Sequence, residues 1–479
     1  MRAMPLLVLL ASTALPAAAQ RTACVVVDID PSGYARNLAG PGGTNILFVS
    51  GPVEIHCGAG TIVRADSAHS LGSELRLIRN VFYQDSAQVM TATTANYFRD
   101  EGRLIARGDV VVRDREGPSV VRGTELLYER VTPSRPEARI VVRGRPRAYL
   151  YEAGTPALPP GLAPSPAARV VAGDTIPAAL QVDGDRLELQ GEDRVLVHGR
   201  VQLIRENLRA FGDAADYDRA AGRLELTSNA RLEGEGYELF GERITATMPG
   251  EQLERVLAEG NAMLMGDELQ VRAPIIDIGL ADGEVERMIA VSRDEGVLAS
   301  AVADDFSLIA DSIQADAPAS VVERITAVGN AYGERAVDSA SAALPELVRS
   351  DWLRGDTIVG TFIRLAAADT AEGDTARTVL ETLTASGSAR SLYRMASADA
   401  EAERPAVNYM SASRIALRFS EGEVSEVEAD GPVEGVHLEP IRAASVDPDA
   451  EAEPLDGDAA DPGADVEGAT SSRGPEASR

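Results

Sequence analysis

The sequence predicts an all-β protein built from about ten tandem repeats of two strands each. Short segments alternate strictly between apolar and polar residues, which is the period of a strand with one face turned away from water. The same pair of segments recurs almost from one end of the chain to the other. Helix signals are scarce and aromatic residues make up only 4% of the chain, so the expected core is aliphatic and thin.

The repeat is clearest between residues 208 and 234. Its first segment is a small residue, Gly212, followed by apolar residues three and five positions later. Its second segment alternates, and Ser228 occupies the middle position where most other copies carry Gly. A mid-strand residue without a bulky side chain tolerates a bend or a close approach of two backbones. The mid-strand glycines of the second segments are Gly51, Gly108, Gly199, Gly260, Gly329 and Gly431.

The apolar positions of the second segments are expected to share one face of the sheet, because alternate residues of a strand point to the same side. These positions are called the apolar-face residues below. They are Val53, Ile55, Leu104, Ala106, Val110, Val112, Val195, Val197, Val201, Leu203, Leu224, Leu226, Ala230, Leu232, Val256, Ala258, Ala262 and Leu264.

The first 19 residues have the features of a secretory signal peptide. Arg2 supplies the positive start, an apolar run covers residues 6–10, and small residues precede a cleavage site near Ala19. The apolar run is too short to span a bilayer. We therefore expect the mature chain to be exported and soluble.

Composition divides the rest of the chain into repeat blocks and connecting segments. The stretch rich in Pro, Ala and Gly after residue 153 cannot be a central strand and predicts a linker or a long loop. The acidic end of the chain has few large apolar residues and is expected to be disordered. The predicted divisions are a signal peptide at 1–19, a first repeat block at 20–153, the linker or loop at 154–177, a second repeat block at 178–335, a short helical or loop insertion at 336–350, C-terminal repeats at 351–442 and the acidic tail at 443–479.

The chain has two cysteines, Cys24 and Cys57. In an exported protein a disulfide between them is plausible, and it would tie the first strand to the segment that ends near Ile55. The alternative is that both are small hydrophobic residues buried separately. Spacing alone does not distinguish the two, because it does not show proximity.

Charge and motifs argue against several classes of function. A net charge of −29 disfavours nucleic acid or an anionic membrane surface as a partner. No phosphate-loop, dinucleotide or nucleophile-elbow motif occurs between a predicted strand and a predicted helix. The four histidines are not paired with Cys or carboxylates at the spacing of metal ligands. They are His56, His69, His198 and His437. We therefore expect no enzyme activity, no metal and no cofactor.

Six segments carry a family resemblance: residues 63–68, 103–112, 254–262, 324–331, 353–358 and 408–415. They resemble the organic-solvent-tolerance-like (OstA-like) superfamily of periplasmic lipopolysaccharide-transport proteins. The resemblance covers most of residues 44 to 440 and lies in the short repeat described above.

The resemblance implies an elongated antiparallel sheet that is folded over on itself, an open β-jellyroll, in the periplasm. The mid-strand glycines would lie along the fold line, and the apolar-face residues would line a groove that shields the lipid A acyl chains of lipopolysaccharide. About twenty strands at a spacing of about 4.8 Å would make a sheet on the order of 100 Å long. The implied partners are lipopolysaccharide and, by end-to-end strand pairing, other transport proteins of the inner and outer membranes or further copies of this chain.

The repeat pattern alone also fits a closed β-sandwich or solenoid whose apolar face packs only on itself. Such a module would serve a structural or adhesive role without a lipid ligand. An enzyme built on a β-solenoid is a third interpretation, and it would need pairs of carboxylates on one face. Lipid that co-purifies with the protein would distinguish the first two.

Overall fold

The structure is a computed structural model of the 479-residue chain. It describes residues 24–40, 45–58, 60–152, 154–171, 173–234, 236–266, 269–293, 296–303, 306–335, 349–365, 377–395, 405–420 and 423–440. The expected signal peptide, nearly all of the insertion at 336–350 and the acidic tail lie outside these residues.

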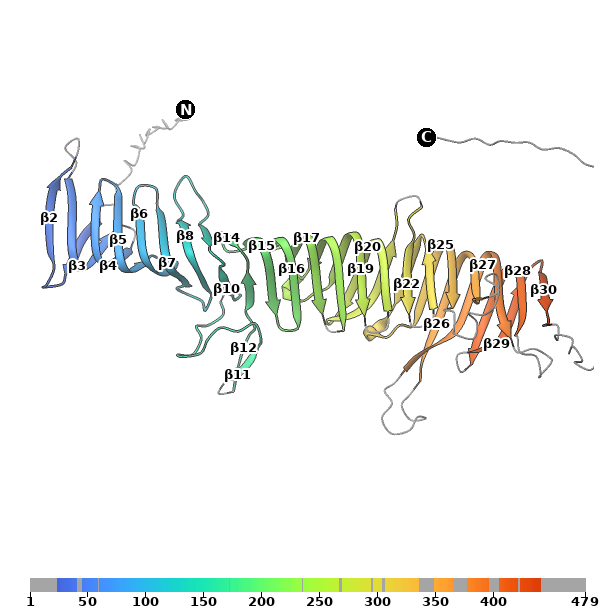
Figure 1. Cartoon of the computed structure of the whole chain (residues 1–479). Coiled ribbons are helices and arrows are strands. Elements are labelled where there is room, and N and C mark those ends of the chain that lie inside the picture. The colour runs from blue at the N-terminus through green and yellow to red at the C-terminus, as the bar shows by residue number, and fades with distance from the viewer. Residues whose placement is uncertain are drawn as a thin grey trace, which may run out of the picture.

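The prediction of an all-β protein is confirmed, because 28 strands of the described residues join in one antiparallel sheet (Figure 1). The N-terminal strands are β1 (Cys24–Ile29), β2 (Tyr34–Ala39), β3 (Asn45–Cys57), β4 (Thr61–Leu71), β5 (Glu74–Gln84), β6 (Gln88–Phe98), β7 (Arg103–Asp114), β8 (Val120–Glu129), β9 (Arg139–Arg143) and β10 (Arg147–Leu150). The central strands are β13 (Leu180–Asp183), β14 (Arg186–Gln190), β15 (Arg194–Arg205), β16 (Leu208–Asp218), β17 (Arg223–Gly234), β18 (Tyr237–Thr247), β19 (Arg255–Gly266), β20 (Leu269–Ala281) and β21 (Glu284–Val291).

The C-terminal part of the same sheet contains β22 (Ala299–Ala303), β23 (Phe306–Ala310), β24 (Ser312–Asp316), β25 (Arg324–Arg335), β26 (Trp352–Leu365), β27 (Arg377–Met395), β28 (Ala406–Ser420), β29 (Glu423–Asp430) and β30 (Glu434–Leu438). The strands β11 (Arg169–Val171) and β12 (Asp174–Ile176) form a separate hairpin. Within the described part of the chain, single turns of 3₁₀ helix are η2 (Pro249–Glu251) and η3 (Pro318–Ser320).

Each long strand crosses from one half of the folded sheet to the other, which the pairing of the short strands makes plain. For example, β2 pairs with the first part of β3, and β1 pairs with its second part. We call the half that contains β1, β10, β13, β22, β23 and β30 half-sheet A, and the half that contains β2, β9, β14, β21, β24 and β29 half-sheet B. The turns that join strands within the same half lie along its free border, which we call rim A in half-sheet A and rim B in half-sheet B.

Strands bend from one half-sheet into the other at a two-residue irregularity in the pairing. In β19, Gly260 (φ +77°) and Asn261 (φ +50°) both take the left-handed conformation, and the register shifts between Glu259 and Ala262. Relative to β20, the bend adds one residue to β19, and Ala258 and Ala262 on its two sides both face the interior. Ser228 (φ +59°) replaces the glycine in β17.

All six mid-strand glycines have positive φ. Five lie within such register shifts, and Gly431 lies between β29 and β30. The small residue of the neighbouring first segment lies at the same bend. A Cβ atom on Gly241 would come within 3.1 Å of two backbone oxygens, those of Arg243 and Glu259, so a side chain would crowd this corner.

A carboxylate on the neighbouring strand supports several of these bends. Asn229 follows Ser228 in the bend of β17, and its side-chain amide donates to Asp213 in β16 at 2.9 Å. Asn80 donates to Asp66 at 3.0 Å in the same way. Asn is one of the few residues other than Gly that takes the left-handed conformation at low cost. The bends are therefore stabilised by backbone preference and by a side-chain hydrogen bond together.

The sheet continues without a break past the Pro-rich segment at 154–177. Strand β8 pairs with both β9 and β10, and β15 pairs with both β13 and β14. The pairs β9–β14 and β10–β13 close the gap between them. The segment is a loop on rim A that contains the β11–β12 hairpin, and the backbone N–H of Glu206 donates to the carbonyl oxygen of Pro166 at 2.7 Å. The two repeat blocks are therefore parts of one sheet.

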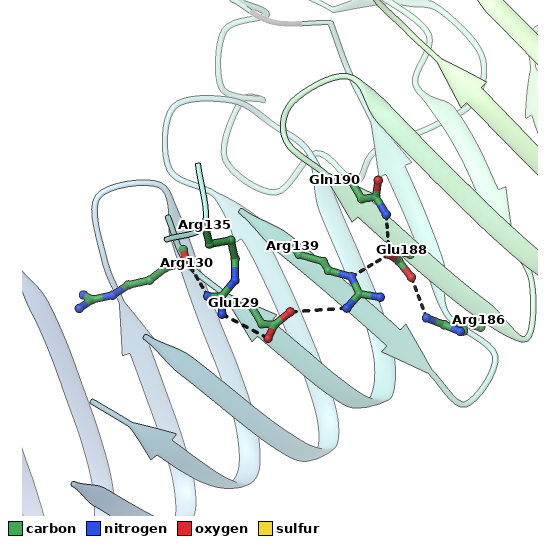
Figure 2. A network of polar contacts seen from close by, with 7 residues as sticks. All are labelled: Glu129, Arg130, Arg135, Arg139, Arg186, Glu188 and Gln190. Carbon is green, nitrogen blue, oxygen red and sulfur yellow. Dashed lines mark hydrogen bonds and ion pairs between the residues drawn. The ribbon is translucent and has the colours of Figure 1, made fainter. Parts of the chain in front are cut away.

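A network of ion pairs crosses this junction on the outside of half-sheet B (Figure 2). Arg139 contacts the carboxylate of Glu188 at 2.7 Å and that of Glu129 at 3.5 Å. Arg186 and Gln190 also donate to Glu188, at 2.7 Å each. The hydrogen bond from Arg139 is the main reason that the pKa of Glu188 is lowered to about 2. The side chain of Glu188 is only 6% exposed, so its partners replace most of its water.

A disulfide joins Cys24 to Cys57 at the N-terminal end of half-sheet A. The two residues are directly opposite each other in the pairing of β1 with β3. In the chain-entropy account, closing a loop with a sequence separation of 33 residues stabilises the fold by about 3–4 kcal/mol. The bond fixes the first strand of half-sheet A to its neighbour.

Gly260→Val should destabilise the protein by about 1–3 kcal/mol, because a β-branched residue is strained at positive φ and its Cβ would lie 2.7 Å from that of Glu242. Thermal unfolding followed by circular dichroism measures the change. The matched control is Gly279→Val in the next strand, where the new Cβ would meet only the carbonyl oxygen of Arg287 at 3.9 Å. Equal melting temperatures for wild type and Gly260→Val would contradict the assigned role of the bend.

Glu188→Gln should lower the free energy of unfolding by about 1–3 kcal/mol at neutral pH, because the arginines lose a buried charged partner. The pKa of Glu188 is lower in the folded than in the unfolded chain, so its charge stabilises the fold above about pH 4.5 and this effect fades as the pH falls toward 2. The gap in melting temperature between wild type and variant should therefore close in acid. Glu426→Gln is the control, because Glu426 forms an exposed ion pair with Arg418. This substitution should change the melting temperature little at any pH.

Candidate functional site

The inward faces of the two half-sheets pack against each other and form one apolar interior. All apolar-face residues except Leu264 are at most 4% exposed, and Leu264 packs against the same core while partly exposed. The inward residues of the neighbouring first segments, such as Val271 and Ile276, belong to the same buried cluster. Over most of its length the interior is therefore filled by the protein's own side chains, in place of the open trough that the resemblance implied.

The interior reaches solvent where the rims lie apart, over β15 to β21. A cavity of about 730 Å³ opens there between the turns of rim A and the turns of rim B. We call it the rim opening. Two apolar-face residues, Leu203 and Leu224, line it. Further apolar lining comes from Leu180, Leu208, Leu253 and Val285. Its size lies within the range of small-molecule sites, about 300–1,000 Å³.

Charged residues surround the rim opening, and carboxylates outnumber arginines. The carboxylates are Glu152, Glu206, Asp282 and Glu284. Arg205 pairs with Glu152 at 3.5 Å. Arg219, on rim B, donates to the carbonyl oxygen of Tyr151, on rim A, at 2.8 Å. Both guanidinium groups are engaged by the chain itself, so the opening combines an apolar lining with an acidic border.

Three tyrosines fill the interior on the N-terminal side of the rim opening. Tyr83 belongs to half-sheet A, whereas Tyr97 and Tyr128 belong to half-sheet B, and each is at most 3% exposed. The ring of Tyr83 meets the other two edge to face, at centroid distances of 5.6 Å and 6.1 Å. Such pairs are attractive beyond the area that they bury. We call this cluster the tyrosine barrier.

The buried carboxylate of Asp85 ties the tyrosine barrier to rim A. Asp85 lies in the turn after β5 and accepts hydrogen bonds from the hydroxyls of Tyr83 at 3.1 Å and Tyr128 at 2.8 Å. It also accepts from the backbone N–H groups of Ala87 and Gln88. Burial raises the pKa of both tyrosines well above the usual range, and the nearby Asp85 raises it further, so both hydroxyls remain donors. The contact links a turn of one half-sheet to a strand of the other.

The histidines lie on the outside of the sheet, far from one another. His56 contacts Glu54 at 2.6 Å, and His437 contacts Glu439 at 2.8 Å. The ring of His69 packs against that of Phe48 in a tilted arrangement, with centroids 4.6 Å apart. Within the described residues, no group of three or more His, Cys, Asp or Glu side chains is placed to hold a metal ion. Among the same residues, no helix has the length and apolar character needed to cross a bilayer.

Fold and interior together define a class: an elongated, all-β sheet folded along one line around an apolar interior that opens sideways to solvent. Among solved structures, the chain is similar to LptH from Pseudomonas aeruginosa, described as the LptA homologous periplasmic component of the conserved lipopolysaccharide transport device. The similarity has a TM-score of 0.15 and 12% sequence identity, and it covers 36% of this chain and 92% of that chain. No protein-family model and no curated protein sequence matches the chain.

Sequence reasoning missed both the rim opening and the tyrosine barrier. The opening is built largely from turns, such as those near Leu253 and Val285, which carry no repeat signal. For the barrier a signal did exist, because Asp85 follows Tyr83 at an inward position where the repeat carries apolar residues. A buried carboxylate in such a place needs hydrogen-bond donors, which the two tyrosine hydroxyls supply.

Proposed function

We propose that this protein is a periplasmic carrier that binds lipopolysaccharide through its lipid A acyl chains and shields them on the way to the outer membrane. The observation that carries the proposal is the apolar interior with its rim opening of about 730 Å³. Each methylene group moved from water into such a site contributes about 0.8 kcal/mol, so even part of one acyl chain supplies useful affinity.

Two features of the sequence support the same proposal. The repeat resembles that of OstA-like lipopolysaccharide-transport proteins, and the first 19 residues have the pattern of a secretory signal. The disulfide between Cys24 and Cys57 suits an oxidising compartment outside the cytoplasm. Export to the periplasm and a lipid cargo are therefore proposed together. The same proposal includes the absence of enzyme activity.

One observation favours a second candidate, a structural module without a ligand. The apolar-face residues other than Leu264 are no more than 4% exposed, so they pack on one another as they would in a closed β-sandwich. Under this alternative the rim opening would be only a local gap between turns. The two candidates differ in whether lipid contacts the residues that line the opening.

A photo-crosslinking residue at Leu224 should capture lipopolysaccharide in cells, because Leu224 lines the rim opening. The matched control is the adjacent Glu225, which faces outward and pairs with Arg223 at 3.0 Å and Arg243 at 3.3 Å. Immunoblotting for lipopolysaccharide on the purified adducts gives the readout. Capture at neither position would favour the structural module, and equal capture at both would indicate adhesion to the surface.

The proposal extends to partners, because among the described strands β1 and β30, at the two ends of the sheet, each pair on one side only. The edge strands β1 and β30 both belong to half-sheet A and carry exposed apolar residues, among them Val25 at 60% and Val436 at 53%. An edge strand with free backbone groups is a template for another chain. End-to-end pairing with other lipopolysaccharide-transport proteins, or with further copies of this chain, follows from that geometry.

Purified protein should assemble end to end as its concentration rises, and removal of residues 443–479 should leave this assembly intact or strengthen it. Val436→Asp should weaken it, because a charge on the edge strand disfavours pairing with another chain. Sedimentation velocity over a range of concentrations measures all three proteins. Monomeric behaviour of the wild type and of the shortened chain at high concentration would count against edge pairing.

A further inference from the structure

We propose that the interior is divided into compartments, and that hydrocarbon chains enter sideways through the rim opening and are held only in the compartment beneath it. This inference rests on the proposed carrier function and names the place and route of binding. The tyrosine barrier closes the compartment toward the N-terminus. The protein then holds its ligand in one compartment, and the ligand does not move along the whole length of the sheet.

The rim opening has both a mouth and a floor. Its mouth lies between rim A residues such as Leu208 and rim B residues such as Leu253. Beneath it, Leu226, Leu232 and Ile244 are fully buried, with 0% exposure. A hydrocarbon chain placed between mouth and floor contacts apolar side chains from both half-sheets, while one side remains open to solvent. Entry across the rims therefore does not require a strand to separate from its neighbour.

Toward the N-terminus, packed side chains and cross-rim contacts block the passage. Arg219 bridges the rims by donating to the Tyr151 carbonyl oxygen at 2.8 Å. Farther along, the tyrosine barrier spans the interior, and Asp85 holds Tyr83 and Tyr128 in place. To pass, a hydrocarbon chain would have to move buried rings and leave the Asp85 carboxylate without its donors, which is costly in an apolar environment.

Toward the C-terminus, the interior is closed by packed apolar side chains. Leu308, Ile313 and Ile358 belong to the same core and are at most 4% exposed. Among the described residues, the lining of the rim opening extends only as far as Val285 and Ser320. The ligand compartment therefore ends near β21.

The border of the opening indicates which part of the ligand is recognised. Four carboxylates surround it, and the two arginines are engaged by Glu152 and by the Tyr151 carbonyl oxygen. Because both guanidinium groups are already engaged, an anionic headgroup is not favoured by an ion pair at the border of the opening. The compartment therefore takes the hydrocarbon chains of an amphiphile, and the headgroup stays in solvent outside the rims.

Photolabelling of the purified full-length protein tests this division. The probe is palmitic acid with a photoreactive diazirine near its methyl end, and mass spectrometry locates the labelled peptides. Label is expected on the segments of Leu208, Leu224 and Leu253, and none on those of Leu77 and Met90, which lie beside the tyrosine barrier or beyond it. Labelling on both sides of the barrier would overturn the division while leaving the carrier function standing. Absence of label anywhere would overturn both.

Two variants sharpen the result. Leu253→Trp should fill the opening and reduce labelling roughly tenfold, which corresponds to about 1.4 kcal/mol of binding free energy. Val302→Trp is the matched control, since Val302 is 48% exposed on β22 and lies outside the opening, and it should label like the wild type. Full labelling of a folded Leu253→Trp protein, checked by circular dichroism, would overturn entry through the opening.

The barrier itself is tested by Tyr97→Ala, which removes one ring and should let label spread to Leu77 and Met90. Tyr128→Phe keeps the ring and removes only the hydrogen bond to Asp85, so it folds more readily and should allow a smaller spread. If the label stays confined in both proteins, the tyrosines are not what closes the compartment, and that part of the proposal fails.

Discussion

The whole architecture depends on the bend at which each long strand turns from one half-sheet into the other. At the bend the register between paired strands shifts by one residue, as from Glu259–Ile275 to Ala262–Ala273. Strand β19 keeps its inward alternation across the bend with two left-handed residues, Gly260 and Asn261. Strand β20 crosses the same bend with one residue fewer, so Ala273 and Ile276 are both buried. The bend can therefore recur in strand after strand without interrupting the apolar interior.

Because the long strands bend along one line, the two half-sheets face each other over the length of the sheet. What fills the interior at each point is then decided by the inward side chains. Tyrosines fill it near the N-terminal end, leucines and isoleucines form its floor in the centre, and alanines predominate farther on. The same bend places the turns on two opposed rims. Whether the rims touch or part depends on local contacts such as that between Asp85 and Tyr128.

Much of the fold could be predicted from the sequence, and most of the site could not. Alternation alone predicted the strands of residues 208–234, and the recurring mid-strand position of Gly260 marked the bend. Local patterns of this kind reflect backbone geometry and burial within one strand. The rim opening and the tyrosine barrier join residues that are far apart in sequence, such as Tyr83 and Tyr128, and no local period reports such contacts. The continuity of the sheet past 154–177 likewise depended on pairing between β10 and β13.

Pairing between sequence neighbours also has a consequence for how the chain acquires its structure. Each long strand bonds to the strand just before it and the one just after it, so a growing sheet needs only the next segment to extend. Loops closed in this way are short, and their entropic cost is small and repeated in equal steps. Folding can therefore proceed as a zipper from the disulfide-pinned end of half-sheet A, without waiting for the last residues. An error in one bend would stall the zipper locally and leave the strands already added intact.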